Sequence, residues 1–311
     1  MASVADPGGS AATQQMWALE TTGEGTLRHT WRPRPARAPG EMLLCAAAAW
    51  LPEAGLPEVV WRIAEADAEH SDLVGSCAIP LCAGPAAEEP MLLSEYACLP
   101  ACRVFPLPAR RPAEEACLLR AAARVLCAIR LARIEIGQSV AVLGTELPLL
   151  VAAQWARVAG AYDVYILGQE PRGLELARRL WLGVVRSDEP LRATAWLREQ
   201  SDGAGVDLAI VDGPAWARAG AWDADSAATV LAPGGRVLDL AVSAPEPSRH
   251  DLAVAARTWA SGRLILRGLA GEAVPAGTPP ATVASGCPVP DAFLIFGSGS
   301  EGAVYAGGLT A

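Results

Sequence analysis

The sequence GQSVAVLGTELPLL (residues 137–150) contains the pattern that decides the fold of the second half of this chain. Residues 139–143 are a short apolar run rich in valine, which predicts a buried strand. Gly144 allows the tight turn that follows. From Pro148 the apolar side chains recur at helical spacing as far as Val158, and proline is common in the first turn of a helix. The stretch therefore predicts a strand, a turn and a helix.

A strand that turns directly into a helix is where the G-x-G-x-x-G fingerprint of dinucleotide-binding folds occurs. Its second glycine lets the backbone approach the pyrophosphate, and its third lets helix and strand pack closely. Those two positions hold Glu146 and Leu149 in this chain. A carboxylate would repel two phosphates at the start of a helix, where the low dielectric strengthens the repulsion. The pattern therefore favours a dinucleotide-binding fold and argues against binding of the dinucleotide itself.

Strands and helices alternate along the rest of the second half. Strands are predicted at 139–143, 163–167, 183–186, 206–211, 236–240 and 263–267, and helices at 148–159, 171–181, 191–200, around Ser226 and at 250–261. This alternation predicts a parallel, doubly wound sheet. Before it, short strand candidates broken by Gly and Pro give way at Pro112 to a helical pattern, and near the end a helix at 291–296 and a strand at 303–305 are expected.

Five segments follow from these patterns. We expect a disordered tail at 1–15, a β-rich domain at 16–111, a linking helix at 112–136, an α/β domain at 137–268, and a return to the first domain at 269–311. The letters of a second G-x-G-x-x-G occur at Gly297–Gly302. Only nine residues follow it, so no second strand–helix unit can form there, and it predicts a flexible turn.

Composition excludes several classes of function. The net charge is −9 without any basic run, which argues against nucleic acid or anionic membranes as partners. The sequence contains no lysine, which excludes a Walker lysine, a Schiff-base lysine and a lysine general base. No apolar run reaches the roughly 18 residues that a membrane span needs. The start of the sequence lacks the charged and apolar regions of a secretory signal.

The eight cysteines lie mostly in apolar stretches and form no C-x-x-C pair. We interpret them as buried free thiols, as in a cytoplasmic protein. Cys98 and Cys102 are separated by three residues, but no second pair or nearby histidine completes a metal site. The three histidines, at positions 29, 70 and 250, belong to no local catalytic motif.

Six phrases, taken in order, resemble one enzyme superfamily. They are GEMLLCAAAAWL (40–51), LLSEYACLPACRVFPLP (92–108), GQSVAVLG (137–144), ARVAGAYDVYILGQEPRGLELARRL (156–180), GVDLAIVDG (205–213) and LAPGGRVLDL (231–240). Their order resembles the medium-chain dehydrogenase/reductase superfamily, the group of zinc alcohol dehydrogenases and quinone reductases. The resemblance implies a GroES-like β-rich domain followed by a Rossmann domain with a doubly wound parallel sheet.

The zinc positions of that superfamily are not matched. Where the resemblance places the catalytic-zinc cysteine, this chain has Pro52, and where it places the ligand histidine it has Ser71. His70 stands one place away and is read either as a displaced ligand or as a solvated loop histidine. A short loop at 83–90 replaces the four-cysteine lobe of the structural zinc. We therefore expect no metal and no catalytic residue.

The end of the second strand departs from the pattern as well. There the fingerprint calls for an acid that binds the ribose hydroxyls of NAD, or a small residue with an arginine for NADP. Gly168 occupies this position and Arg172 follows in the next helix. Arg172 would serve NADP or would simply be a solvated residue at a helix start. The degenerate fingerprint thus comprises Gly144, Glu146, Leu149, Gly168 and Arg172, and the expected cofactor is none, or NADP if any.

Three functions are compatible with these departures. The first is a non-catalytic scaffold or regulatory subunit, a dehydrogenase-like pseudoenzyme. The second is a zinc-independent, NADP-dependent oxidoreductase. The third is a protein whose interdomain cleft binds another small ligand. The resemblance implies pairing between subunits through an edge strand, here Arg263 to Arg267, in a homo-oligomer or with an active relative or larger complex.

Overall fold

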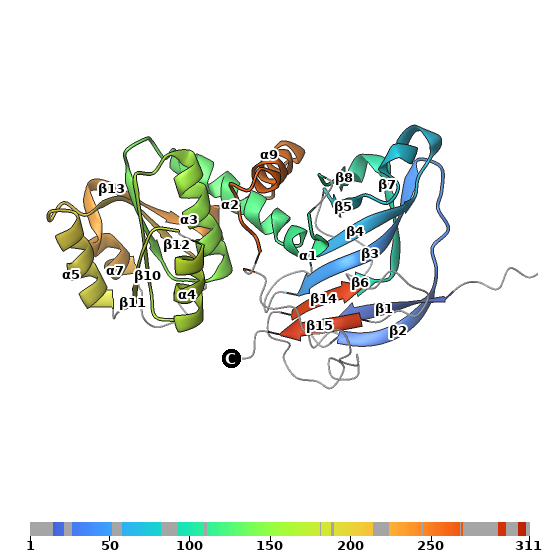
Figure 1. The fold of residues 1–311 in the computed structure, drawn as a ribbon, viewed down its shortest axis with the longest axis horizontal. Helices are drawn as coiled ribbons and strands as arrows, with labels where there is room; N and C mark the ends of the chain where they lie inside the picture. The colour runs from blue at the N-terminus through green and yellow to red at the C-terminus, as the bar shows by residue number, and fades with distance from the viewer. Residues whose placement is uncertain are drawn as a thin grey trace, which may run out of the picture. The chain divides into compact units, whose positions relative to one another are not determined.

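The structure is a computed structural model, and it describes two compact units. The described residues are 15–21, 27–51, 58–81, 93–108, 111–180, 182–187, 190–213, 224–243, 245–267, 269, 292–296 and 304–308. One unit comprises Met1–Leu107 and Val274–Ala311, and the other comprises Pro108–Ala273 (Figure 1). Of the tail expected at 1–15, only Gln15 is among the described residues, and it begins a strand.

The first unit is built of antiparallel sheets. Its strands are β1 (Gln15–Thr21), β2 (Leu27–Pro33), β3 (Glu41–Leu51), β4 (Glu58–Glu65), β5 (Cys77–Pro80), β6 (Leu93–Ser94), β7 (Tyr96–Pro100), β8 (Val104–Pro106), β14 (Ala292–Phe296) and β15 (Val304–Gly308). The order in the small sheet is β2-β1-β6. In the large sheet it is β15-β14-β3-β4-β5-β8, and β7 pairs with β3. Met42, Leu44, Trp61 and Ile63 form the centre of its core.

The second unit is a parallel sheet covered on both faces. Its elements are α1 (Ala113–Ala116), α2 (Leu119–Ala132), β9 (Ser139–Leu143), α3 (Leu147–Ala159), β10 (Asp163–Gly168), α4 (Pro171–Arg179), β11 (Val184–Ser187), α5 (Pro190–Gln200), β12 (Val206–Val211), α7 (Ala224–Thr229), β13 (Leu231–Asp239), α8 (Leu240–Ser243) and α9 (Arg249–Ala260). The strand order is β11-β10-β9-β12-β13, and every pairing is parallel. The doubly wound sheet expected from the sequence is confirmed.

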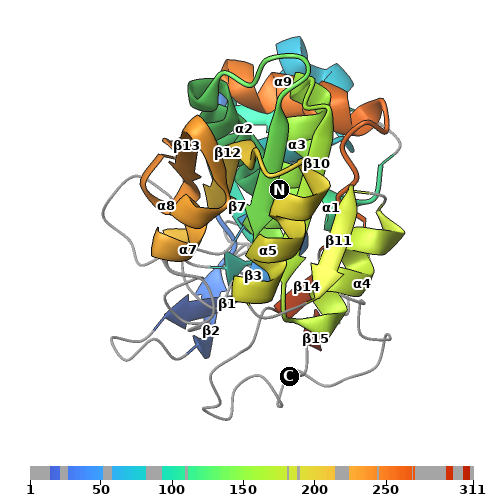
Figure 2. The same ribbon diagram turned by 90° about the vertical axis from the view of Figure 1, so that its left-hand side faces the viewer.

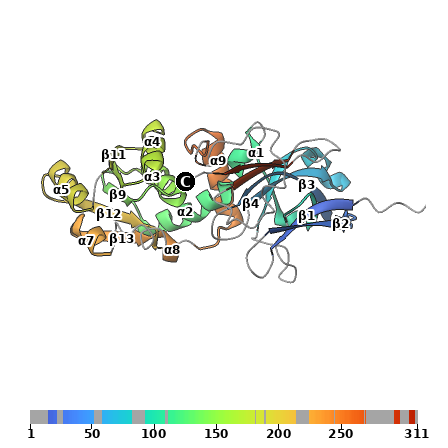
Figure 3. The same ribbon diagram turned by 90° about the horizontal axis from the view of Figure 1, so that it is seen from below.

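Alternation of side chains along the strands explains the two layers of helices. Leu143, Leu167 and Val211 pack with Ala193 and Leu197 of α5. The intervening side chains of the same strands face the opposite way, because successive residues of a strand point to opposite faces. They are also buried, under α3 and α4. Figure 3 shows α5 and α7 on one side of the sheet and α3 and α4 on the other, and Figure 2 looks past α5 and α7 onto the sheet.

The strand predicted at 263–267 is wrong. These residues form turns and coil, and they pair with no strand of the described part of the chain. The buried side chain of Gln154 on α3 takes the role of a neighbouring strand: its Oε1 accepts from the Ile265 N–H at 2.7 Å and its Nε2 donates to the Ile265 carbonyl at 3.0 Å. Leu264 and Leu266 are buried. The segment is therefore held by an amide side chain and forms no strand with the described part of this chain.

The helix predicted at 291–296 is also wrong. Residues 292–296 form β14, which pairs antiparallel with β3 from Ala292 opposite Leu51 to Ile295 opposite Ala48, and with β15 on its other side. A five-residue apolar run fits a helix or a strand equally well, and long-range pairing decides between them. The linking helix, expected at 112–136, is two helices: α1 ends at Ala116 and α2 ends at Ala132.

Candidate functional site

The five fingerprint positions lie together at the carboxyl ends of β9 and β10. These two strands are parallel neighbours, so their carboxyl ends meet at the same edge of the sheet. The Gly144 N–H donates to the Leu167 carbonyl at 2.7 Å and joins the turn after β9 to the end of β10. The chain runs from β9 to β10 on one side, and β12 lies on the other. This is the switch point at which open α/β sheets bind ligands.

Two side chains lie directly against the turn at Gly144. The residue has φ +130°, a conformation that L side chains rarely adopt. A β-carbon at this position would lie 2.5 Å from Cδ1 of Leu149 and in contact with Oε2 of Glu146. Leu149 is fully buried in the first turn of α3, and Glu146 is exposed. The residues that replace the second and third glycines thus cover the first one.

The two helices that begin at this edge use their glutamates differently. Glu146 occupies the N-cap position of α3, but its side chain accepts no capping hydrogen bond. Glu170 caps α4: its carboxylate accepts from the backbone N–H of Arg172 at 2.9 Å and from that of Gly173. A carboxylate in this place satisfies the free donors of the helix start and favours the positive end of the helix dipole. The start of α4 is therefore already occupied by an anion of the chain itself.

Thr145 fills the space between the two turns, and the sequence patterns do not single it out. Its side chain is buried, with 8% of the residue exposed. A β-carbon at Gly168 would lie 2.9 Å from Cγ2 of Thr145, and one at Gly173 would lie 2.5 Å from its Cβ. Position 145 faces β10 because β9 and β10 are parallel neighbours. The glycines at positions 168 and 173, which both lie against the branched side chain of Thr145, are the sequence feature that could have indicated this contact.

Carboxylates dominate the charge of this sheet edge. Glu146 follows β9, Glu170 follows β10 and Asp212 follows β12, and Asp239 ends β13. Asp239 accepts from the N–H of Gly213 at 3.0 Å and from that of Ala241 at 2.9 Å. Arg172, exposed in the first turn of α4, is the cation among the five fingerprint positions. The edge is therefore electrostatically unfavourable for a ligand that carries two phosphates.

The positions expected for zinc lie in the first unit. Pro52 and the loop 83–90 are outside the described residues. Ser71 and His70 are on the 3-10 helix Ala68–Leu73 that follows β4, where the Ser71 hydroxyl donates to the Ala68 carbonyl at 2.9 Å and His70 Nδ1 lies 3.5 Å from the Glu69 carboxylate. Within the described ranges no three His, Cys, Asp or Glu side chains come together in a way that could hold a metal ion.

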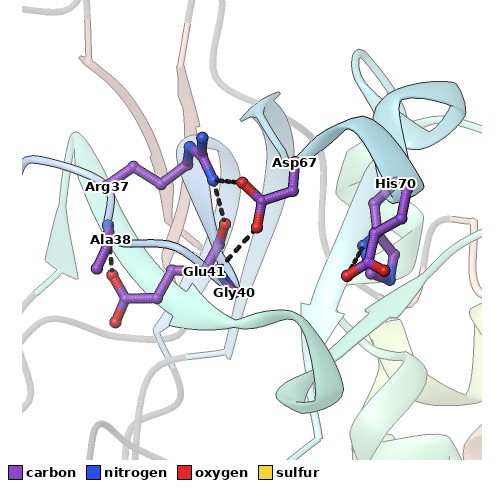
Figure 4. Close-up of polar contacts among 7 residues, drawn as sticks. Arg37, Ala38, Gly40, Glu41, Asp67 and His70 are labelled. Carbon is purple, nitrogen blue, oxygen red and sulfur yellow. Dashed lines mark hydrogen bonds and ion pairs between the residues drawn. The ribbon is translucent and has the colours of Figure 1, made fainter.

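The carboxylate that directly precedes this helix has a structural role. Asp67 accepts from the guanidinium of Arg37 and, at 2.7 Å, from the Gly40 N–H, while Arg37 also donates to the Glu41 carbonyl at 3.2 Å (Figure 4). The hydrogen bond from Arg37, followed by that from Gly40, lowers the pKa of Asp67 below its ordinary value of 3.8. The cluster fastens the proline-rich link between β2 and β3 to the end of β4.

Comparisons with known proteins relate the chain to others through its fold. No protein-family model matches the sequence, and no curated protein matches it. Solved structures do match. AibC has a TM-score of 0.63 at 20% identity and covers 81% of this chain and 90% of its own. A putative zinc-binding dehydrogenase from Sinorhizobium meliloti, bound to NADP, has a TM-score of 0.62 at 19% identity with the same coverage.

A third match is an oxidoreductase/dehydrogenase of unknown specificity from Escherichia coli, with a TM-score of 0.66 at 15% identity, covering 82% of this chain and 90% of its own. At these identities the likeness concerns the fold. No helix in the described ranges is both long and apolar enough to cross a membrane. The chain has the fold of medium-chain alcohol dehydrogenase-like oxidoreductases, a GroES-like domain combined with a Rossmann domain.

Proposed function

We propose that this chain is a non-catalytic, cytoplasmic protein that keeps the dehydrogenase fold and acts as a scaffold or regulatory subunit of an oligomeric assembly. The observation that carries the proposal is the contact of Glu146 and Leu149 with the turn at Gly144. In the usual fingerprint this turn is made of glycines so that the backbone can approach the pyrophosphate. A carboxylate and a buried leucine replace that open backbone.

The chemistry of the donor set supports the same conclusion. A bound dinucleotide needs backbone N–H groups at the start of α3 and a cationic or neutral surrounding for its phosphates. The residues present do not fit it, because Glu146 lies against the turn at Gly144, and Glu170, Asp212 and Asp239 follow or end the neighbouring strands at the same edge. Hydride transfer requires the cofactor, so a chain without this site cannot carry out the reaction. Natural selection would then keep the fold for its surfaces, which can bind other proteins.

A zinc-independent, NADP-dependent oxidoreductase is the second candidate. Gly168 at the end of β10, with Arg172 in the following helix, favours it, since a small residue and an arginine at these positions suit a 2′-phosphate. The S. meliloti dehydrogenase of the same fold is bound to NADP. Against it stands the carboxylate of Glu170, which already occupies the first backbone donors of α4.

A titration of the purified chain with NADPH and with NADH, followed by nicotinamide fluorescence, tests the proposal. We expect no enhancement or blue shift at concentrations of either nucleotide up to about 1 mM, which corresponds to a binding free energy weaker than about 4 kcal/mol. An active dehydrogenase of the same fold provides the positive control. Saturable binding of NADPH in the micromolar range would overturn the proposal and establish the second candidate. Light scattering of the same sample reports whether the chain associates.

A further inference from the structure

We infer that Thr145, independently of Glu146 and Leu149, excludes an acid at position 168 and so removes the group that would bind the ribose hydroxyls of NAD. The inference rests on the proposed function and concerns the other end of the same site. The end of the second strand, here Gly168, is where a dinucleotide-binding sheet presents the acceptor for the ribose hydroxyls. Gly168 itself offers no side-chain acceptor.

The geometry explains why position 168 holds glycine. Its backbone is not in the left-handed region, so the conformation itself would allow a side chain. The obstacle is Thr145, whose Cγ2 lies 2.9 Å from the place of a β-carbon at 168. Thr145 is buried and branched at Cβ, and such side chains have few rotamers to choose from. An acid at 168 therefore cannot coexist with Thr145 in this arrangement.

The contact with α4 is tighter and of a different kind. At Gly173 a β-carbon would contact Oγ1 of Thr145 and lie 2.5 Å from its Cβ and 2.9 Å from Oε2 of Glu170. Rotation about χ1 moves Oγ1 and Cγ2 but leaves Cβ in place. Any residue with a β-carbon at position 145 therefore requires glycine at 173. Glycine at 168, in contrast, is required only by the branched side chain of Thr145. Thr145, Gly168 and Gly173 form one interlocked set.

Thermal unfolding of glycine variants tests the interlock without any ligand. In the wild-type background Gly168→Ala and Gly173→Ala should each lower Tm by about 3–10 °C, the effect of overpacking a tight site in a domain of this size. In the Thr145→Ala background Gly168→Ala should cost little, while Gly173→Ala should remain destabilising. Only Thr145→Gly should relieve Gly173→Ala. Equal losses of Tm in all backgrounds would overturn the interlock.

A ladder of binding variants tests the consequence for nucleotides, with NADH fluorescence as the readout. Glu146→Gly with Leu149→Ala opens the pyrophosphate turn, and Thr145→Ala with Gly168→Asp supplies the ribose acceptor. We expect each pair alone to show no NADH binding up to about 1 mM, and the four substitutions together to bind NADH at least tenfold more tightly than this limit. Glu199→Gly with Leu252→Ala removes similar groups elsewhere and serves as the control.

The outcomes distinguish the inference about Thr145 from the proposed non-catalytic function. Binding by the pyrophosphate pair alone would overturn the role of Thr145 and leave the proposed function standing. Binding by the wild-type chain would overturn the proposed function itself. A folded quadruple variant that binds no NADH would overturn the role of Thr145 in excluding the ribose. If the quadruple variant does not fold, the unfolding measurements on the single and double glycine variants decide the inference.

Discussion

Replacing Gln154 by methionine should destabilise the second unit by about 2–4 kcal/mol. Gln154 is 4% exposed, and its amide makes two hydrogen bonds with the backbone of Ile265. Each neutral hydrogen bond contributes about 1 kcal/mol, and leaving its part-buried partner at Ile265 without a replacement adds up to about 1 kcal/mol. Methionine has a similar length and keeps the apolar packing. The loss of unfolding free energy therefore reports the hydrogen bonds of the amide and not the creation of a cavity.

Urea unfolding followed by tryptophan fluorescence measures this loss. With an m-value of about 2 kcal/mol per molar, the midpoint should fall by about 1–2 M. Hydrogen exchange gives a second and local readout, because the Ile265 N–H donates to Gln154 and should exchange faster in the variant. Gln200→Met, at an exposed position on α5, is the matched control and should leave both measurements unchanged. A loss below about 0.5 kcal/mol with unchanged exchange at Ile265 would refute the role assigned to Gln154.

Two further predictions follow from titrating groups. Burial, with a smaller contribution from Asp251, raises the pKa of Cys127 to about 11, so about one thiol in a thousand is ionised at pH 8. Iodoacetamide at pH 8 should therefore modify the exposed Cys102 well before Cys127, as peptide mass spectrometry will show, and equal rates would contradict this. The hydrogen bond from Arg37 lowers the pKa of Asp67 from 3.8, so the stabilisation it gives is present above that pH and is lost as the pH falls through the folded value. Asp67→Asn should shift the urea midpoint more at pH 7 than at pH 3, and a shift independent of pH would count against the ion pair.

The alternating strands and helices could be predicted because their side chains obey a local period. The runs at 139–143 and 206–211 are strands with the bounds that periodicity predicts. The segment 263–267 also reads as a short strand, with three consecutive apolar residues between two arginines. Its conformation depends on Gln154, more than a hundred residues away, and no local pattern contains that contact.

At the candidate site, too, local patterns could be predicted and long-range contacts could not. Glu146 and Leu149 could be singled out because they stand at fixed offsets from Gly144, and a fingerprint is a pattern of offsets. Thr145 could not, since its position in the fingerprint accepts any residue. Its importance arises from Gly168 and Gly173, which β10 and α4 bring against it. Spacing along the chain therefore predicts which residues lie in one turn. Contacts between residues of two different turns are seen only in the folded structure.

The pairing of β3 with β14 sets the order in which the chain can fold during synthesis. Residues about 240 positions apart meet in this ladder, and contacts so distant in sequence form late. Every pairing of the parallel sheet, in contrast, lies within residues 139–239. At 5–20 residues per second the ribosome needs about 10–50 s to extend the chain from β3 to β14. During that time β3, an eleven-residue strand, waits for one of its partners, and a chaperone that shields exposed strand edges would find its longest opportunity there.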